Sequence, residues 1–212
     1  FCSSTGGWLP LLCTMNCTVA TELTRALLEA DLREMELWAA RARPGCDGVV
    51  TLPFFNGERT PNLPRGRGCL VGLTPANYTR PNALRSAMES AVYGLRLGLE
   101  SFTKLGFRPR ELKLIGGGSK SRLWRQLVAD IFQLPVVCPE EEEAAAFGAS
   151  LQAAWCHANH EGKKHDLNAI LEDHVALDRD KRHRPNLSNG RLYETTYQEY
   201  KEYVGAVTPI FS

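Results

Sequence analysis

Residues 112–122 constrain the fold of this chain more than any other stretch. An apolar segment that begins Leu-Lys-Leu-Ile leads into Gly116, Gly117 and Gly118, and an amphipathic segment follows over residues 123–132. This order predicts a strand that turns through glycines into a helix. Glycine permits a positive φ in so tight a turn and leaves the backbone N–H groups uncovered. Because those groups would lie at the positive end of the helix dipole, a nucleotide phosphate or ribose is the first ligand to consider.

The glycine turn alone does not establish a nucleotide site. Ser121 stands where the pattern G-x-x-x-x-G-K-[ST] requires its second glycine, and the pattern G-x-G-x-x-G does not fit either. Three consecutive glycines also suit a flexible connection that binds nothing. The local pattern therefore leaves both interpretations open.

Helices and strands alternate along the rest of the chain. A first helix is predicted from Thr18, and further helices over residues 32–42, 81–106, 140–155 and 192–204. Strands are predicted within residues 47–55, 68–73, 112–115 and 134–138. Gly94 and Gly98 in the longest helix each cost about 1 kcal/mol relative to Ala, so close packing there is expected. The order of elements is typical of an α/β sheet that binds its ligand at the carboxyl ends of its strands.

Net charge and cysteine content exclude several partners and compartments. With a formal net charge of +1 over 212 residues, the chain has no overall field that would favour nucleic acid or an anionic membrane, and neither partner is expected. The seven cysteines are scattered and odd in number, which is typical of free thiols in a reducing cytoplasm. No apolar run approaches the roughly 18 residues of a membrane span, and the first residues do not form a signal peptide. We therefore expect a cytoplasmic protein. Because Phe1 is not an initiator, we also expect this chain to be a piece of a longer one.

Two polar stretches invite interpretation as metal sites. Residues 140–143 are four glutamates, but acidic side chains also suit the first turn of a helix, and we favour that interpretation. A charged stretch over residues 157–189 contains five histidines without regular ligand spacing: His157, His160, His165, His174 and His183. We therefore predict no metal-binding residue and interpret this stretch as a solvated connection.

Seven motifs occur in one order along the chain. They are residues 52–61 (Leu-Pro-Phe-Phe-Asn-Gly-Glu-Arg-Thr-Pro), 67–73 (Arg-Gly-Cys-Leu-Val-Gly-Leu), 84–89 (Leu-Arg-Ser-Ala-Met-Glu), 114–121 (Leu-Ile-Gly-Gly-Gly-Ser-Lys-Ser), 124–126 (Trp-Arg-Gln), 129–130 (Ala-Asp) and 143–149 (Glu-Ala-Ala-Ala-Phe-Gly-Ala). Through these motifs, residues 1–154 resemble the carboxy-terminal domain of the FGGY carbohydrate kinases. The chain departs from the family at Ala83, where a larger aliphatic residue is usual, and after Trp155, where no counterpart is evident.

The resemblance implies a fold and a domain organisation. The fold would be α/β, of the actin-like, ribonuclease-H-like ATPase type, and the chain would form one lobe of a two-lobed sugar kinase. Residues 1–212 would constitute the carboxy-terminal nucleotide-binding lobe. Within it, residues 1–16 would form the junction with the amino-terminal lobe, residues 157–190 a polar connection and residues 191–206 the terminal helix.

The resemblance also implies ATP or ADP, with Mg²⁺, as cofactors. The implied nucleotide-binding residues are Gly116, Gly117 and Gly118 against the phosphate and ribose, and Ser119, Ser121 and Arg122 toward the base. The catalytic aspartate and most sugar contacts would come from the amino-terminal lobe, so no catalytic residue is assigned here. Glu58 and Arg59 suit the pinning of a turn at least as well as cleft chemistry, and Asp130 is expected to face solvent or cap a neighbour.

The implied activity is ATP-dependent phosphorylation of a ketose. Overall similarity favours D-xylulose, with D-xylulose 5-phosphate as product, and gluconate, ribulose and glycerol are alternatives. Outside the enzyme class, the alternative is a non-catalytic actin-like module that binds a nucleotide or a partner. An upstream catalytic aspartate would distinguish these hypotheses. Tyrosines on the last predicted helix suit a core or an interface equally, which leaves a homodimer open.

Overall fold

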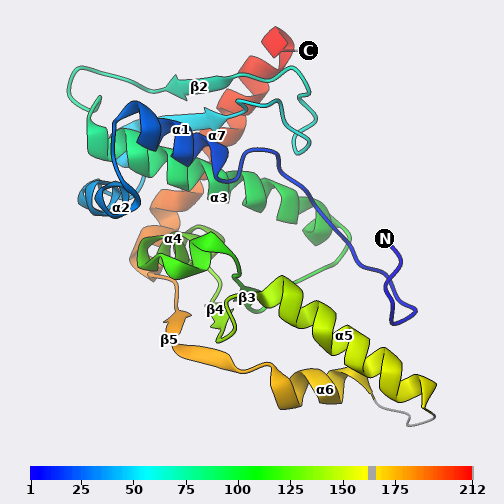
Figure 1. The fold of residues 1–212 in the computed structure, drawn as a ribbon. Coiled ribbons are helices and arrows are strands. Elements are labelled where there is room, and N and C mark those ends of the chain that lie inside the picture. Colours follow the sequence, from blue (N-terminus) through cyan, green and yellow to red (C-terminus); the bar gives the residue numbers. More distant parts are fainter. Residues whose placement is uncertain (162–165, 212) are drawn as a thin grey trace. The chain divides into compact units, whose positions relative to one another are not determined.

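The structure, a computed structural model, describes residues 1–161 and 166–211 in two compact units (Figure 1). The first unit comprises Phe1–Arg108, Asp130–Phe132 and the chain from Asn186 onward. The second comprises Pro109–Ala129 and the described residues from Gln133 to Pro185. Within the described residues, no helix is both long enough and apolar enough to cross a membrane.

The first unit consists mainly of helices around a two-stranded sheet. Its elements are α1 (Val19–Leu27), α2 (Leu32–Arg41), a 3-10 turn (Cys46–Gly48), β1 (Val50–Pro53), β2 (Gly68–Val71), α3 (Arg80–Lys104) and α7 (Leu187–Phe211). Asp31 begins α2 with a capping box, in which its carboxylate accepts from the Glu34 N–H and the Glu34 carboxylate accepts from the Asp31 N–H. Thr79 caps α3, and Pro81 lies in the first turn. The helices predicted in this part of the chain are therefore confirmed, but α7 is longer at both ends than the predicted residues 192–204.

The long helix α3 organises the core of the first unit. It packs against α1, α2, β1 and α7 (Figure 1). All four residues of β1 are buried, and β1 pairs antiparallel with β2. A Cβ on Gly98 would lie 2.1 Å from Cδ2 of Leu12, so the expected close packing is confirmed there. The same expectation is wrong for Gly94, where the nearest atom, the Tyr200 hydroxyl oxygen, would be at an ordinary 3.9 Å.

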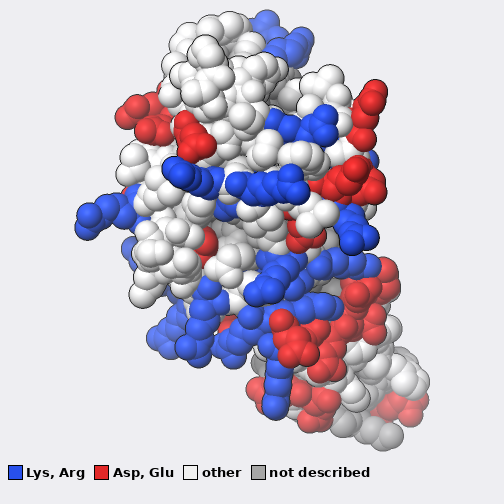
Figure 2. Space-filling model, turned by 90° about the vertical axis from the view of Figure 1, so that its left-hand side faces the viewer, with Lys and Arg blue, Asp and Glu red and all other residues white. Residues whose placement is uncertain are grey.

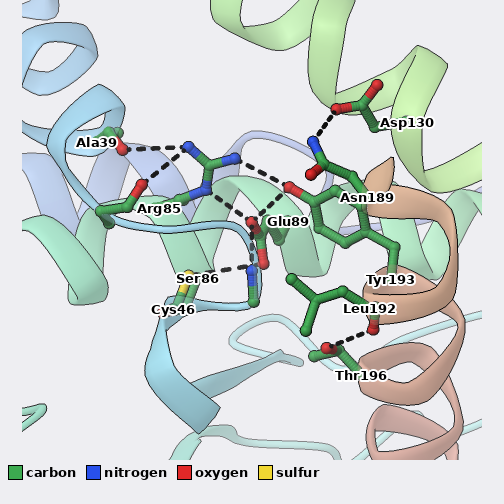
Figure 3. Close-up of polar contacts among 12 residues, drawn as sticks. Ala39, Cys46, Arg85, Ser86, Glu89, Asp130, Asn189, Leu192, Tyr193 and Thr196 are labelled. Carbon is green, nitrogen blue, oxygen red and sulfur yellow. Dashed lines mark hydrogen bonds and ion pairs between the residues drawn. The ribbon is translucent and has the colours of Figure 1, made fainter. Parts of the chain in front are cut away.

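A buried ion pair lies at the centre of the first unit (Figure 3). Nε of Arg85 lies 2.7 Å from Oε1 of Glu89, one turn further along α3. The Tyr193 hydroxyl of α7 accepts from Nη2 of Arg85 at 2.9 Å and donates to Oε1 of Glu89, also at 2.9 Å. Burial raises the pKa of Glu89, and the charge and hydrogen bonds of Arg85 oppose that rise.

The same pair binds the segment between α2 and β1. Nη1 of Arg85 donates to the carbonyl oxygen of Ala42 at 3.2 Å, just after α2 ends. The Glu89 carboxylate accepts from the Gly45 N–H at 3.2 Å and from the Cys46 thiol at 3.5 Å. Gly45 has a φ of +75°, a conformation that favours glycine. One ion pair thus connects α2, the following turn, α3 and α7.

Asp130 binds the start of α7 instead of facing solvent. Its side chain is buried, and its carboxylate oxygens accept from the Asn186 N–H at 2.7 Å and from Nδ2 of Asn189 at 2.9 Å. Asp130 therefore anchors the start of α7 through Asn186 and Asn189, and the expectation that it faces solvent is wrong. The physical reason is that Asp130 lies in the last turn of the helix Arg122–Phe132, and this turn is buried, with Ile131 fully covered.

The second unit contains a three-stranded sheet and three helices. Its elements are β3 (Leu112–Lys113), a 3-10 turn (Gly117–Lys120), the first eight residues of α4 (Arg122–Phe132), β4 (Val136–Pro139), α5 (Ala144–His160), α6 (Leu167–His174) and β5 (Leu177–His183). The strand order is β3-β4-β5, with β3 parallel and β5 antiparallel to β4. The described strands therefore form two small sheets, β1-β2 and β3-β4-β5, instead of the single α/β sheet expected.

The stretch expected to be a polar connection contains regular structure. Both α6 and β5 lie within residues 157–190, and α7 begins at Leu187, before the predicted residue 192. The sequence did not predict β5 because it is a charged edge strand, Leu-Asp-Arg-Asp-Lys-Arg-His, without an apolar face. His165, one of the five histidines, lies outside the described residues.

The buried ion pair generates a stability prediction. Glu89→Leu or Arg85→Met alone should each cost about 3–5 kcal/mol in the free energy of unfolding, because each leaves one charge buried without its partner. The double variant should cost less than the sum of the two by about 1–3 kcal/mol. Urea denaturation followed by circular dichroism measures all three.

A matched control for that cycle is Glu22→Gln, which breaks the exposed i,i+3 pair with Arg25 and should cost at most about 1 kcal/mol. Strict additivity of the Arg85 and Glu89 substitutions would show that the two side chains do not act as a pair.

Candidate functional site

The glycine turn joins β3 to α4, as predicted from the sequence. The Leu114 N–H donates to the Val137 carbonyl at 2.9 Å, which extends the pairing of β3 with β4 up to the turn. Gly116 has a φ of +79°, and a 3-10 turn over Gly117–Lys120 follows. The Ser121 hydroxyl then accepts from the Trp124 N–H at 3.1 Å and caps α4. The strand, turn and helix are therefore confirmed, and the 3-10 turn between them was not predicted.

The three glycines differ in what the fold requires of them. Only Gly116 has a positive φ, so a side chain there would be strained. A Cβ on Gly117 would meet no atom within 4 Å, and one on Gly118 would meet only the Trp124 ring, at 3.9 Å. The structure therefore leaves open space on the Gly117 backbone, which lies at a helix start, where N–H groups lack intrahelical partners. Such a backbone can bind an anion.

The polar side chains of the turn have distinct surroundings. The Ser119 hydroxyl donates to the Gly116 carbonyl at 2.7 Å, which closes the turn on itself. The Ser121 hydroxyl is engaged in the cap of α4. Arg122, the first residue of α4, is exposed. Of the predicted nucleotide-binding residues beyond the glycines, two serines thus shape the turn, and one arginine presents a positive charge beside it.

A buried arginine lies directly behind the turn. Arg125 is only 7% exposed, and its Nη1 donates to the Ser119 carbonyl at 2.6 Å. Its Nε donates to Nδ1 of His183, at the end of β5, at 3.3 Å. Reasoning from the residues did not assign Arg125 a role, although it lies in the Trp-Arg-Gln motif. Its position in the first turn of a helix that follows glycines is the signal that could have identified it.

The run of glutamates precedes α5 instead of forming its first turn. The Glu141 carboxylate accepts from the Glu143 N–H at 3.1 Å, and α5 begins at Ala144. Oε2 of Glu142 lies 2.8 Å from Nζ of Lys120, the last residue of the 3-10 turn. This hydrogen bond and the lysine charge lower the pKa of Glu142. The run therefore attaches the start of α5 to the glycine turn.

Charges of both signs lie close together on the protein surface. Figure 2 shows Asp and Glu side chains beside a dense group of Lys and Arg side chains on the face it presents. Lys181 of β5 illustrates the pattern, because its Nζ lies 3.3 Å from Oδ2 of Asp178 and 3.9 Å from Oε1 of Glu142. Among the residues that the structure describes, no group of three or more His, Cys, Asp and Glu side chains is arranged to hold a metal ion.

A hollow of about 430 Å³ lies between α5 and α6. It is lined by Ala144, Ala145, Gly148, Ala149, Leu151, Gln152, Leu167 and Leu171. None of these side chains titrates, so the hollow could accept an apolar group but offers no acid or base.

Glu58 has a structural role in the first unit. Its carboxylate is 5% exposed and accepts from the Met15 N–H at 2.7 Å, from Nδ2 of Asn16 at 3.1 Å and from the Arg59 N–H at 2.8 Å. Glu58 thus pins the turn after β1 and also anchors the segment that precedes α1. Arg59 contributes to this arrangement through its backbone.

Comparison with known proteins shows which family the chain belongs to. Residues 1–157 match the model of the FGGY family of carbohydrate kinases, C-terminal domain. A xylulose kinase from Haemophilus influenzae is 44% identical over 200 residues, which cover 94% of this chain and 40% of that protein. The chain therefore spans well under half the length of this relative.

Solved structures share the fold. A ligand-bound xylulose kinase from Lactobacillus acidophilus matches with a TM-score of 0.83 and 25% identity, over 94% of this chain and 40% of that one. A Plasmodium falciparum glycerol kinase with ADP matches with a TM-score of 0.68 and 18% identity, over 88% of this chain and 36% of that one. The expected fold class is thus confirmed: a mixed α/β domain that matches the actin-like C-terminal lobe of these kinases. The chain belongs to the FGGY family of carbohydrate kinases, of which it contains the C-terminal domain.

Proposed function

We propose that this chain is the ATP- and ADP-binding lobe of a kinase that phosphorylates D-xylulose to D-xylulose 5-phosphate. The observation that carries the proposal is the glycine turn, which presents uncovered backbone between β3 and α4. Its support comes from the xylulose kinases among the relatives in sequence and structure, and from the glycerol kinase of the same fold that was solved with ADP.

Phosphoryl transfer requires positioning of the phosphates, Mg²⁺ to neutralise charge and a carboxylate to accept the proton of the sugar hydroxyl. In this proposal, residues 116–118 hold the phosphate and ribose. Ser119, Ser121 and Arg122 lie toward the base. The open space around Gly117 fits a nucleotide that approaches the backbone. Mg²⁺ would arrive bound to the phosphates, since in such sites it binds mainly to substrate phosphates and water.

The sugar-binding residues and the catalytic aspartate would lie in an amino-terminal lobe. Residues 1–16 would join the two lobes, and this segment exposes large apolar side chains, with Trp8 at 81% and Leu11 at 62%. Such side chains suit a surface that another lobe covers. The terminal helix and the remaining residues would complete the nucleotide-binding lobe of a cytoplasmic enzyme.

Two alternatives have different support. Gluconate, ribulose or glycerol could replace xylulose, since members of the family that act on other substrates, such as the glycerol kinase, share the fold. A non-catalytic module would keep the turn and lack the upstream aspartate. The tyrosines of the last helix do not argue for a homodimer, because Tyr193, Tyr197 and Tyr200 are fully buried within the first unit.

The central test is the substitution Gly117→Val. We expect it to weaken binding of Mg-ADP by about tenfold or more, because a branched side chain would occupy the space that the nucleotide needs. The melting temperature should change little, since Gly117 lacks a positive φ and an added Cβ meets no protein atom within 4 Å. Isothermal titration calorimetry and thermal denaturation measure the two effects.

Gly205→Val provides a matched control, because Gly205 is exposed in α7 and an added Cβ there also meets nothing within 4 Å. Unchanged affinity in a folded Gly117→Val variant would show that the nucleotide does not bind at this turn.

A second test concerns the run of glutamates. Glu141→Gln should change Mg-ADP affinity less than about twofold, because this carboxylate accepts from the backbone just before α5 and forms no ion pair with a described Lys or Arg. Titrations with ADP, in the presence and absence of Mg²⁺, measure the effect. A loss of affinity confined to the titration with Mg²⁺ would instead identify Glu141 as a metal ligand.

A further inference from the structure

Arg125 is a buried cation at the start of α4. In the part of the chain that the structure describes, no carboxylate forms an ion pair with its guanidinium. Its acceptors are the neutral carbonyl of Ser119 and the imidazole of His183. Burying a charge is costly, and proteins usually offset the cost with an opposite charge. Arg125 therefore holds a buried positive charge next to the glycine turn without a direct ion pair to a described carboxylate.

The two hydrogen bonds of Arg125 fix the geometry of the turn. The Ser119 carbonyl belongs to the 3-10 turn, and the bond from Nη1, at 2.6 Å, attaches that turn to the first turn of α4. Within the turn, the Ser119 N–H donates to the Gly116 carbonyl at 3.0 Å and the Ser121 N–H to the Gly118 carbonyl at 3.3 Å. Removing Arg125 would leave the turn to these bonds, to the Ser119 hydroxyl bond with the Gly116 carbonyl and to the exposed ion pair of Lys120 with Glu142.

His183 fixes the orientation of the guanidinium. Because Nε of Arg125 can only donate, Nδ1 of His183 accepts, which requires a neutral ring with its proton on Nε2. A proton on Nδ1 would instead face the Lys181 carbonyl, 3.4 Å away. The charge of Arg125 also reaches the buried Cys138 of β4, where it opposes the rise in thiol pKa that burial causes.

We propose that Arg125 is a positioning residue for the nucleotide, which holds the glycine turn in shape through the Ser119 carbonyl and adds a buried positive charge behind the phosphate-binding backbone. This inference rests on the proposed function. Arg125 acts through the turn and does not touch the ligand, and its charge favours a ligand with phosphates over one without them.

The test compares Arg125→Met and Arg125→Lys with the wild-type chain. Hydrogen exchange at the Ser119 and Ser121 amides reports the turn, and exchange in β4 reports the stability of the second unit. Calorimetric titrations with Mg-ADP and with adenosine measure how far the charge of Arg125 favours a ligand with phosphates over one without them. Arg110→Met is the matched control, because it removes an exposed positive charge from the same unit away from the turn.

We expect Arg125→Met to speed exchange at the two turn amides by about tenfold or more while β4 changes little. The affinity for Mg-ADP should fall by about tenfold and that for adenosine by much less. Arg125→Lys should retain part of the preference for ADP over adenosine but lose protection of the turn, because a lysine lacks the planar fork. The control should match the wild type in both measurements.

Several results would overturn the proposal. Wild-type exchange at the turn in Arg125→Met would show that Arg125 does not hold it, whether or not a nucleotide binds. If hydrogen exchange accelerated equally at the turn and in β4 of both variants, Arg125 would stabilise the second unit as a whole and not the turn in particular. An equal loss of ADP affinity in Arg110→Met would show that only net charge matters. In contrast, a wild-type chain without saturable Mg-ADP binding would contradict the proposed function, while the exchange experiment would still decide whether Arg125 positions the turn.

Discussion

The buried ion pair between Arg85 and Glu89 is the interaction on which the first unit depends. Two charges one turn apart on α3 are removed from water, so every remaining donor and acceptor on them must find a partner. The partners come from segments far apart in the sequence: the Ala42 carbonyl after α2, the Gly45 N–H in the following turn and the Tyr193 hydroxyl in α7 (Figure 3). The need to satisfy one polar pair thus decides where three elements meet α3.

The second unit uses buried polarity differently. Its glycine turn makes backbone available, and the side chains around it also hold that backbone in shape: Ser119 closes the turn, Ser121 caps α4 and Arg125 attaches the two. The proposed recognition of a nucleotide therefore resides in the main chain, with charge supplied from behind. This division explains why a substitution at Gly117 can test binding without disturbing the fold, whereas one at Gly116 cannot.

Much of this arrangement was predictable from the sequence, because regularly spaced apolar residues indicate helices and strands that bury one face. The stripe on α3, the buried strand β1 and the strand, turn and helix around Gly116 follow directly from it. The charged strand β5 has no apolar face and pairs only through its backbone, so no periodicity marks it. The roles of Arg125 and Asp130 depend on partners, His183 and Asn189, that lie more than 50 residues away in the sequence. Such long-range pairing leaves no periodic signal. The available signals were the motifs of the resemblance and, for Arg125, its position in the first turn of a helix that follows glycines.

We propose above all that this chain binds a nucleotide at the glycine turn. The most direct test is a titration of the isotope-labelled chain with Mg-ADP, followed by the backbone amide resonances in nuclear magnetic resonance spectra. The account predicts saturable shifts that are largest at residues 116–122 and small in the first unit around Glu89. Shifts concentrated elsewhere, or no shifts at ADP concentrations that saturate kinases of this family, would contradict it.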